Sequence, residues 1–182
     1  RVPQIEIAMG DGPCVLVFRV LDSPTAGDME SLRRFGEQHG FSVYLQEGGA
    51  QPIRPLSGQK ADLHYSLPKF GIEVYFEPTD FTQVNLELNR LMVDRVVALL
   101  EPQPDERVLD LFCGLGNFTL PLARRAAWVV GVEGDKGLVA RARANAEANG
   151  IHNADFHVAD LYGELGSESW QHELFEKALL DP

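Results

Sequence analysis

The sequence contains little cysteine. Cys14 and Cys113 are the only two cysteines among 182 residues, and they stand far apart without a CxxC spacing. This excludes a disulfide framework and a cysteine-based metal cage. The five histidines also lack the paired spacing that a metal site requires. The sequence therefore predicts no metal site and a reducing, cytoplasmic setting.

Long hydrophobic runs and an excess of positive charge are missing too. Apolar runs such as Val96 to Leu100 fall far short of the roughly 20 residues of a membrane-spanning helix, so we expect no membrane contact. The 16 lysines and arginines face 27 aspartates and glutamates, a net charge of -11, which argues against a phosphate-binding surface over the whole chain. Without an initiator methionine or a signal layout at its start, the chain is expected to be part of a longer protein.

Residues 1–78 predict a small α+β domain. Gly10 to Pro13 is typical of a hairpin turn, Gly40 of a helix end, and the glycine- and proline-rich stretch from Gly48 to Gly58 of a loop. Strand-like runs of β-branched and aromatic residues flank one helical segment. The helix is expected over Asp28–His39 and the strands over Ile5–Ala8, Cys14–Val20, Phe41–Leu45 and Val74–Phe76.

The pattern changes at residues 79–182, which predict a second domain. A helix over Val84–Leu100 carries apolar residues at helical spacing, namely Leu88, Leu91, Met92, Val96 and Leu99. Short strands then alternate with helices, which favours βαβ crossovers and a parallel sheet. The strands are expected over Arg107–Phe112, Trp128–Glu133, Phe156–Ala159 and Lys177–Asp181, and the helices over Phe118–Ala126, Lys136–Asn149 and Trp170–Glu176.

A glycine loop follows the first strand of this second domain. The segment from Asp110 to Asn117 reads DLFCGLGN, and Glu133 closes the next strand. A carboxylate at that place can accept hydrogen bonds from both ribose hydroxyls of a nucleoside cofactor, whereas a solvated loop carboxylate is the alternative. A dinucleotide fingerprint would need a third glycine where Thr119 stands, so NAD is the second choice.

The pattern D-x-x-C-G-x-G-x-F, with Asp160 and Asp181 after the later strands, resembles the class I S-adenosylmethionine-dependent methyltransferases. More narrowly, the chain resembles the RNA uracil-5-methyltransferase family, closest to its 23S ribosomal RNA branch. The motifs that carry this resemblance are Asp80–Asn85, Leu109–Ala123, Val130–Glu133 and Leu180–Pro182.

The resemblance implies a Rossmann-like class I methyltransferase domain, truncated after its fourth strand and preceded by an α+β central domain on the substrate side. Residue-by-residue matching places the S-adenosylmethionine contacts on Gln83, Phe112, Asn117, Glu133, Asp160 and Asp181. The alternatives are helix capping for Gln83, core packing for Phe112 and a turn cap for Asp181. Many relatives have asparagine at the Asp160 position, and aspartate there can accept a hydrogen bond but not donate one.

The family's chemistry also indicates what this chain does not contain. A cysteine adds to uracil C6 and a base removes the C5 proton, and both groups are expected beyond Pro182. The resemblance thus implies no catalytic residue in this chain, and Cys113 is expected to be a packed loop residue. The cysteines of the iron–sulfur cluster found in some members are expected before Arg1.

The function implied is 5-methyluridine formation in 23S ribosomal RNA by a monomeric parent enzyme. A transfer-RNA uridine methyltransferase and a non-catalytic cofactor- or RNA-binding piece remain the alternatives.

Overall fold

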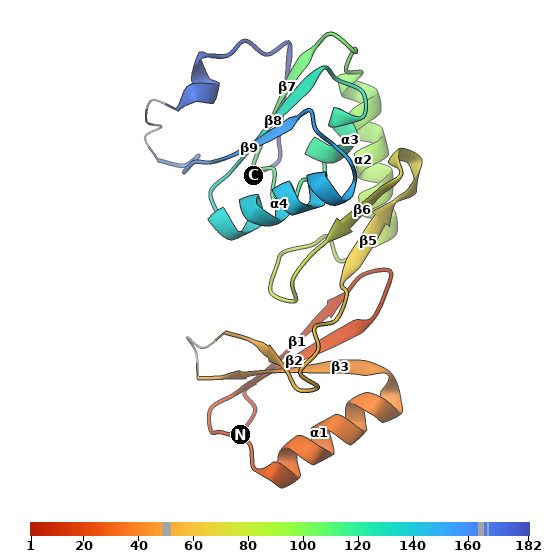
Figure 1. Cartoon of the computed structure of the whole chain (residues 1–182), viewed down its shortest axis with the longest axis vertical. Coiled ribbons are helices and arrows are strands. Elements are labelled where there is room, and N and C mark those ends of the chain that lie inside the picture. The colour runs from red at the N-terminus through yellow and green to blue at the C-terminus, as the bar shows by residue number, and fades with distance from the viewer. Residues whose placement is uncertain (49–51, 164–165, 167) are drawn as a thin grey trace. The chain divides into compact units, whose positions relative to one another are not determined.

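The computed structural model describes residues 1–48, 52–163, 166 and 168–182, and divides the chain into two compact units (Figure 1). The first unit comprises Arg1–Tyr65 and Phe76–Phe81, and the second comprises Ser66–Tyr75 and Thr82–Pro182. The segment Ser66–Tyr75, which lies before residue 78 in the sequence, thus belongs to the second unit, and Phe76–Phe81 belongs to the first. Whether folding domains divide at that residue stays a prediction.

The first unit contains a four-stranded sheet in the order β1-β2-β3-β4. Its strands are β1 (Gln4–Met9), β2 (Cys14–Val20), β3 (Phe41–Glu47) and β4 (Arg54–Pro55). The predicted hairpin is confirmed, because β1 and β2 pair antiparallel across the Gly10 turn. Gly10 suits this turn, since an added Cβ would lie 1.9 Å from the carbonyl oxygen of His64. The predicted loop from Gly48 to Gly58 includes β4, and its residues 49–51 lie outside the described residues.

Helix α1 (Ala26–His39) connects β2 to β3, which pair in parallel. Thr25 begins the helix with a capping box: its side chain accepts a hydrogen bond from the Asp28 backbone N–H, and the Asp28 carboxylate accepts one from the Thr25 N–H. The helix ends at Gly40, as predicted, with a left-handed φ of 71°. Leu32 packs against the apolar cluster of β2 and β3, and this burial holds the helix on the sheet.

Replacing Thr25 with alanine is expected to destabilise α1 by about 1 kcal/mol, because the Asp28 backbone N–H loses the hydroxyl oxygen that accepts its hydrogen bond. Amide hydrogen exchange in α1 should then be roughly fivefold faster. Ser31→Ala is the matched control, since the Ser31 hydroxyl lies inside the same helix and donates only to the Gly27 carbonyl. Equal effects of the two substitutions would contradict the capping role.

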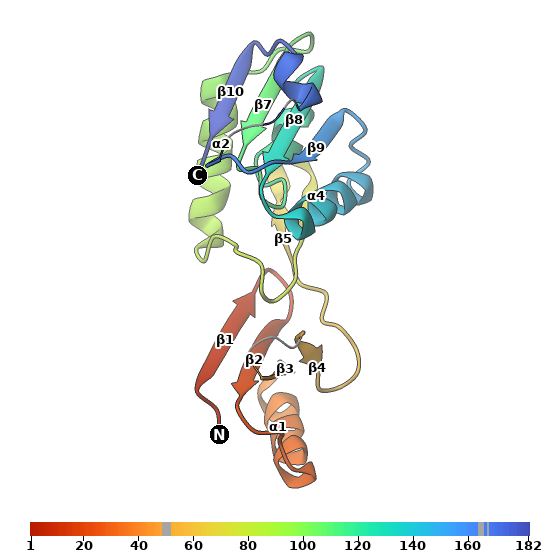
Figure 2. The same ribbon diagram turned by 90° about the vertical axis from the view of Figure 1, so that its left-hand side faces the viewer.

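The second unit is built around a four-stranded sheet in the order β10-β7-β8-β9 (Figure 2). All three pairings are parallel, so the predicted parallel sheet is confirmed. The strands are β7 (Arg107–Leu111), β8 (Trp128–Glu133), β9 (Ala154–Val158) and β10 (Lys177–Leu180). The helices are α2 (Leu86–Leu100), α3 (Thr119–Ala123) and α4 (Lys136–Ala148). Strands β5 (His64–Leu67) and β6 (Ile72–Tyr75) form a separate pair, and two 3-10 turns cover Pro68–Phe70 and Ser169–His172.

The helix predicted over Val84–Leu100 is confirmed as α2, but most of the apolar row that indicated it does not face the core. Among the described residues, Leu88, Leu91 and Leu99 remain 60–66% exposed, whereas the helix buries Asn89, Val93 and Val97. The physical reason is that periodicity identifies a row of apolar side chains but does not say which row faces the core. The buried row is spaced i, i+4, i+8, and it begins with a polar residue. The helix expected over Trp170–Glu176 is reduced to the 3-10 turn Ser169–His172.

Candidate functional site

The carboxyl ends of the four parallel strands bring most of the predicted site residues to one edge of the sheet. Phe112 directly follows β7, Glu133 is the last residue of β8, Asp160 comes two positions after β9, and Asp181 directly follows β10. In open α/β sheets this edge is where ligands bind, so the topology supports a site here. Gln83 is the exception, because it lies in the exposed segment before α2 rather than at a strand end.

The glycine loop has an unusual backbone. Phe112 has a left-handed φ of 63°, and Gly114 and Gly116 have φ values of 54° and 90°. These conformations cost glycine little, and they turn the chain sharply between β7 and α3. Space is tight at Gly116, where an added Cβ would lie 3.0 Å from Cγ of Leu120, and open at Gly114, where it would meet nothing within 4 Å. The loop thus has one packed side and one free side.

Glu133 fastens this loop to the neighbouring strand. One carboxylate oxygen, Oε2, accepts a hydrogen bond from the Gly114 backbone N–H at 3.1 Å, and Oε1 accepts one from the Asp135 N–H at 3.0 Å. Charge-assisted bonds of this kind are stronger than neutral ones. The carboxylate is therefore held beside the glycine loop, and each of its oxygens keeps a lone pair for a ligand.

The two later carboxylates have different surroundings. Asp160 is exposed, and its Oδ1 accepts hydrogen bonds from the backbone N–H groups of Tyr162 and Gly163, which forms a tight turn after β9. Asp181 is exposed too, and its negative charge helps to raise the pKa of the buried Asp110. Both side chains can reach solvent at the same edge of the sheet.

The structure bears on the alternative roles of Phe112 and Gln83, which were core packing and helix capping. The half-buried Phe112 ring lies 5.2 Å from the ring of Tyr162, which is 82% exposed, so the pair forms an accessible aromatic surface rather than core. Asn85, not Gln83, caps α2, because its side chain accepts a hydrogen bond from the Leu88 N–H at 3.0 Å. Gln83 is therefore not needed as the helix cap.

Asp110 is a buried carboxyl that the sequence patterns did not single out by itself. It is fully buried on β7, and its Oδ2 accepts a 2.5 Å hydrogen bond from the Thr119 hydroxyl, while Oδ1 has no partner among the described residues. Burial raises the pKa of Asp110 to about 7, with a smaller contribution from Asp181 and opposition from the Thr119 bond. This bond ties the start of α3 to the centre of the sheet.

Asn117 and Leu115 are held by amide side chains from two helices. Asn117 exchanges hydrogen bonds with Asn89 of α2, and Asn145 of α4 donates to the Leu115 carbonyl at 3.2 Å. Asn145 is buried and also bonds to both backbone groups of Tyr75 in β6. In the sequence, the only sign of Asn89 and Asn145 is an asparagine inside a helical segment, and the structure shows that both lie on the buried face of their helix.

Cys113 is a packed residue of the loop. Its side chain is 3% exposed, and burial raises the pKa of the thiol, with further contributions from the charges of Asp110 and Glu133. A protonated, buried thiol is a poor nucleophile. The described residues also contain no group of three or more histidine, cysteine, aspartate or glutamate side chains placed to hold a metal ion.

Alkylation should distinguish the two cysteines. With iodoacetamide at pH 8, Cys113 of the folded protein is expected to react at least ~100-fold more slowly than in denaturant, because its thiol must first be exposed by local opening. The half-buried Cys14 should be labelled first. Peptide mass spectrometry measures both rates, and comparable rates for the two residues in the folded protein would contradict the buried assignment.

The part of the chain that contains the glycine loop and the strand-end carboxylates is similar to known proteins. The family model described as tRNA (Uracil-5-)-methyltransferase matches residues 65–172, which include the glycine loop, Glu133 and Asp160. The chain belongs to this family. Its membership confirms the resemblance carried by the loop and strand-end motifs.

Two curated relatives of this uracil-5-methyltransferase chain are 23S rRNA (uracil(1939)-C(5))-methyltransferases RlmD. The relative from Methylococcus capsulatus is 55% identical and that from Stenotrophomonas maltophilia 54% identical, each across the whole chain. The chain spans 41% of the length of each.

Among solved structures, the tRNA (uracil-54, C5)-methyltransferase of Pyrococcus abyssi in complex with S-adenosyl-L-homocysteine matches 97% of the chain. The match has a TM-score of 0.69 at 20% identity and covers 42% of that protein. This likeness confirms the predicted methyltransferase fold. No described helix is long and apolar enough to cross a membrane.

Proposed function

We propose that this chain supplies the S-adenosylmethionine-binding part of an enzyme that forms 5-methyluridine in 23S ribosomal RNA. The observation that carries the proposal is the contact between the Glu133 carboxylate and the Gly114 N–H at the carboxyl edge of the sheet. This contact holds a carboxylate beside Gly114, where the space next to the backbone is unfilled. The chain also belongs to the uracil-5-methyltransferase family. The RlmD relatives favour 23S ribosomal RNA as the substrate and a cytoplasmic location.

The residues present fit this cofactor. The free side of the loop at Gly114 leaves space for a ligand, and the donors and acceptors around it match a nucleoside with an amino-acid tail. When bound, S-adenosylmethionine supplies a methyl group attached to a sulfonium. Glu133 would accept hydrogen bonds from the ribose hydroxyls, and Asp160 would accept one from the adenine amine.

The remaining predicted contacts complete the proposed site. Phe112, together with Tyr162, would form an apolar wall, and Asn117 would present its amide from the loop. Asp181 would offset the sulfonium charge. Gln83 would contact the cofactor from the segment before α2, six residues ahead of Asn89, whose side chain already contacts Asn117.

The chemical steps on uracil need groups other than the two cysteines of this chain. Addition of a thiolate to C6 makes C5 nucleophilic, and a base must later remove the C5 proton. Cys113 is buried, and Cys14 lies in the sheet of the first unit. We assign both steps to residues of the full-length protein outside this chain, together with any iron–sulfur cluster.

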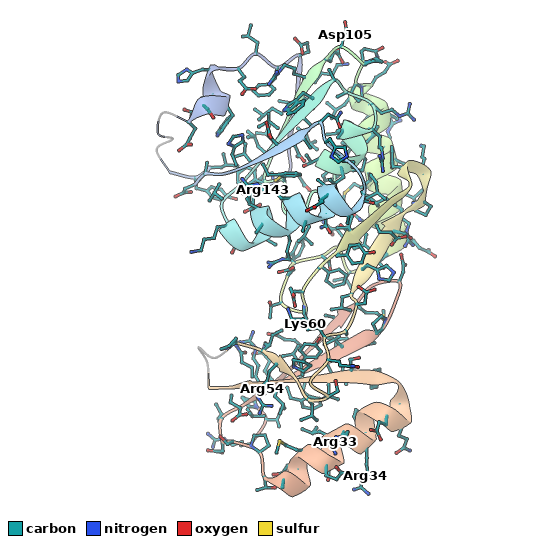
Figure 3. The ribbon with its side chains drawn as sticks, in the orientation of Figure 1. Arg33, Arg34, Arg54, Lys60, Asp105 and Arg143 are labelled. Carbon is teal, nitrogen blue, oxygen red and sulfur yellow. The ribbon has the colours of Figure 1, made fainter. Side chains whose placement is uncertain are left out.

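The lysine and arginine side chains of the described residues give little support to a broad RNA-binding surface on this chain. Figure 3 labels several of them on the surface, and many are neutralised by nearby carboxylates. The ion pairs among the described residues include Arg33–Glu30, Arg54–Glu47, Lys60–Glu77 and Lys69–Asp94. Arg124 instead donates to the carbonyl of Asn149 at 2.8 Å, which is a structural contact. Most phosphate contacts are therefore assigned to the rest of the protein.

Titration calorimetry of the chain with S-adenosylhomocysteine tests the cofactor assignment. We expect binding at least about tenfold tighter than that of NADH, since the loop lacks the third glycine of a dinucleotide site. Tighter binding of NADH would favour an oxidoreductase and would overturn the proposal.

The RNA substrate needs a separate experiment with the full-length protein. Methyl transfer to a 23S ribosomal RNA transcript should exceed transfer to transfer RNA, and replacement of the C5 hydrogen by fluorine should trap a covalent adduct. A preference for transfer RNA would assign the protein to the other branch. Cofactor binding without any methyl transfer would support a non-catalytic binding module.

A further inference from the structure

Helix α4 places two asparagines against strand β6. Asn145 accepts a hydrogen bond from the Tyr75 backbone N–H at 2.9 Å and donates to the Tyr75 carbonyl at 3.1 Å. Asn149 makes the same pair of bonds with Glu73, at 2.9 and 2.7 Å. The spacings match, because four residues of a helix and two residues of a strand each span about 6–7 Å. Each amide therefore binds β6 as a residue of a neighbouring strand would.

The two asparagines differ in their remaining hydrogen bond. The Asn149 amide also donates to the backbone carbonyl of Asn145, within the helix, at 2.7 Å. The Asn145 amide instead donates to the Leu115 carbonyl of the glycine loop at 3.2 Å. Asn145 is 1% exposed, and its three bonds offset the cost of burying the amide. One of these three bonds thus connects α4 to the loop.

The Leu115 carbonyl belongs to the planar peptide unit between Leu115 and Gly116. The N–H of the same unit donates to the Cys113 carbonyl at 2.9 Å, so both polar groups of the plane are held. Leu115 lies between Gly114 and Gly116, which have φ values of 54° and 90°. Glycine has little preference between positive and negative φ, so the local sequence does not fix this plane. The bond from Asn145 helps to select its orientation.

We propose that Asn145 is a positioning residue for the cofactor site: it does not touch the ligand but holds the peptide between Leu115 and Gly116 in the orientation that binds it. This inference rests on the proposed function of the glycine loop as an S-adenosylmethionine site. The open side of the loop at Gly114 is one residue before this peptide, so a turn of the plane would move the backbone that faces the ligand. Fixing the plane in advance removes the cost of ordering it upon binding.

Alanine substitution of each asparagine tests the proposal. Asn145→Ala removes two bonds to β6 and the bond to the loop. Asn149→Ala is the matched control, because it removes two equivalent bonds to β6 and no bond to the loop. In calorimetry with S-adenosylhomocysteine, we expect Asn145→Ala to weaken binding about fivefold and Asn149→Ala to change it less than about twofold. Both substitutions should lower the midpoint of thermal unfolding, and affinity is measured below both midpoints.

A second measurement does not depend on the ligand. In the free protein, the NMR signal of the Leu115 carbonyl carbon should shift in Asn145→Ala, because that carbonyl loses its donor, and stay in place in Asn149→Ala. The Gly116 amide hydrogen should exchange with solvent about fivefold faster in Asn145→Ala alone. If Asn145→Ala does not fold, Asn145→Ser replaces it in both measurements, since it leaves less empty volume and ends one bond short of the amide nitrogen.

Failure of the proposed function and failure of the positioning role give different results. A folded, unmodified chain that binds no S-adenosylhomocysteine would overturn both. If the unmodified chain binds but the Asn145 variant has full affinity, Asn145 only stabilises the fold. Equal weakening by Asn145→Ala and Asn149→Ala would assign the effect to the contact with β6, and the positioning role of the loop bond would again be excluded.

Discussion

Replacing Glu133 with alanine is expected to weaken S-adenosylhomocysteine binding by roughly 100-fold. The substitution has two consequences for the site. It removes the acceptor proposed for the ribose hydroxyls, and it breaks the bond that holds the Gly114 backbone at 3.1 Å. Both effects act on the ligand, because Gly114 lies on the free side of the loop. Calorimetry of the variant measures the loss directly.

A matched variant separates this effect from the loss of one negative charge. Glu147→Ala removes an exposed carboxylate from α4 and should leave affinity within about twofold of the unmodified chain. Glu133→Gln, which keeps an oxygen acceptor without the charge, should fall between the two. Full affinity in Glu133→Ala would show that the carboxylate is a solvated strand end with no part in binding.

The second large effect concerns the buried carboxyl of Asp110 and appears as a pH dependence of stability. Burial raises the pKa of Asp110 from its ordinary value of 3.8 to about 7 in the folded protein. Between pH 4 and pH 7 the folded state thus keeps a proton that the unfolded state has lost. Stability from this group is fully present below about pH 4 and declines as the pH rises to about 7. The shift corresponds to ~4 kcal/mol.

Asp110→Asn should remove this dependence, since the amide stays neutral and its oxygen can still accept the Thr119 bond. We expect the unfolding free energy of the variant minus that of the unmodified chain to become more positive by several kcal/mol between pH 4.5 and pH 8. Urea denaturation followed by tryptophan fluorescence measures it, because Trp128 and Trp170 both lie in the second unit.

A comparison at two pH values cancels the titration of groups far from the substitution. Cys113 and Asp181 are electrostatically coupled to Asp110, so their substitution by alanine in both backgrounds provides the control. A difference that is constant with pH, or that becomes more negative toward pH 8, would show that Asp110 is ionised in the folded protein throughout the range.

Local patterns were sufficient to predict the four strands of the parallel sheet and the loop between β7 and α3. Strand β8 was predicted over the observed Trp128–Glu133, and the glycine loop lies where the spacing placed it. Both follow from properties of neighbouring residues, since β-branched runs favour strands and glycine permits positive φ. Because parallel strands share one carboxyl edge, the meeting of Glu133, Asp160 and Asp181 at that edge was also predictable.

The orientation of α2 was not predictable in the same way. Its sequence has two rows of side chains that could face the core, and the more apolar one, with Leu88 and Leu91, is the exposed row. Asn89 favours the buried row only because Asn117, 28 residues later, satisfies its amide. No window along the chain contains both partners, so helical periodicity could not identify the correct face.

The sequence by itself determined the alternation of strands and helices from β7 to β9, the glycine loop and the strand-end carboxylates, because each depends on residues that are close along the chain. Only the tertiary structure decided how the loop is held: by Glu133 on Gly114, by Asn89 on Asn117, by Asn145 on Leu115 and by Asp110 on Thr119. Each of these bonds joins two different elements. Their formation and the burial that strengthens them depend on packing, which brings together side chains that are distant in sequence.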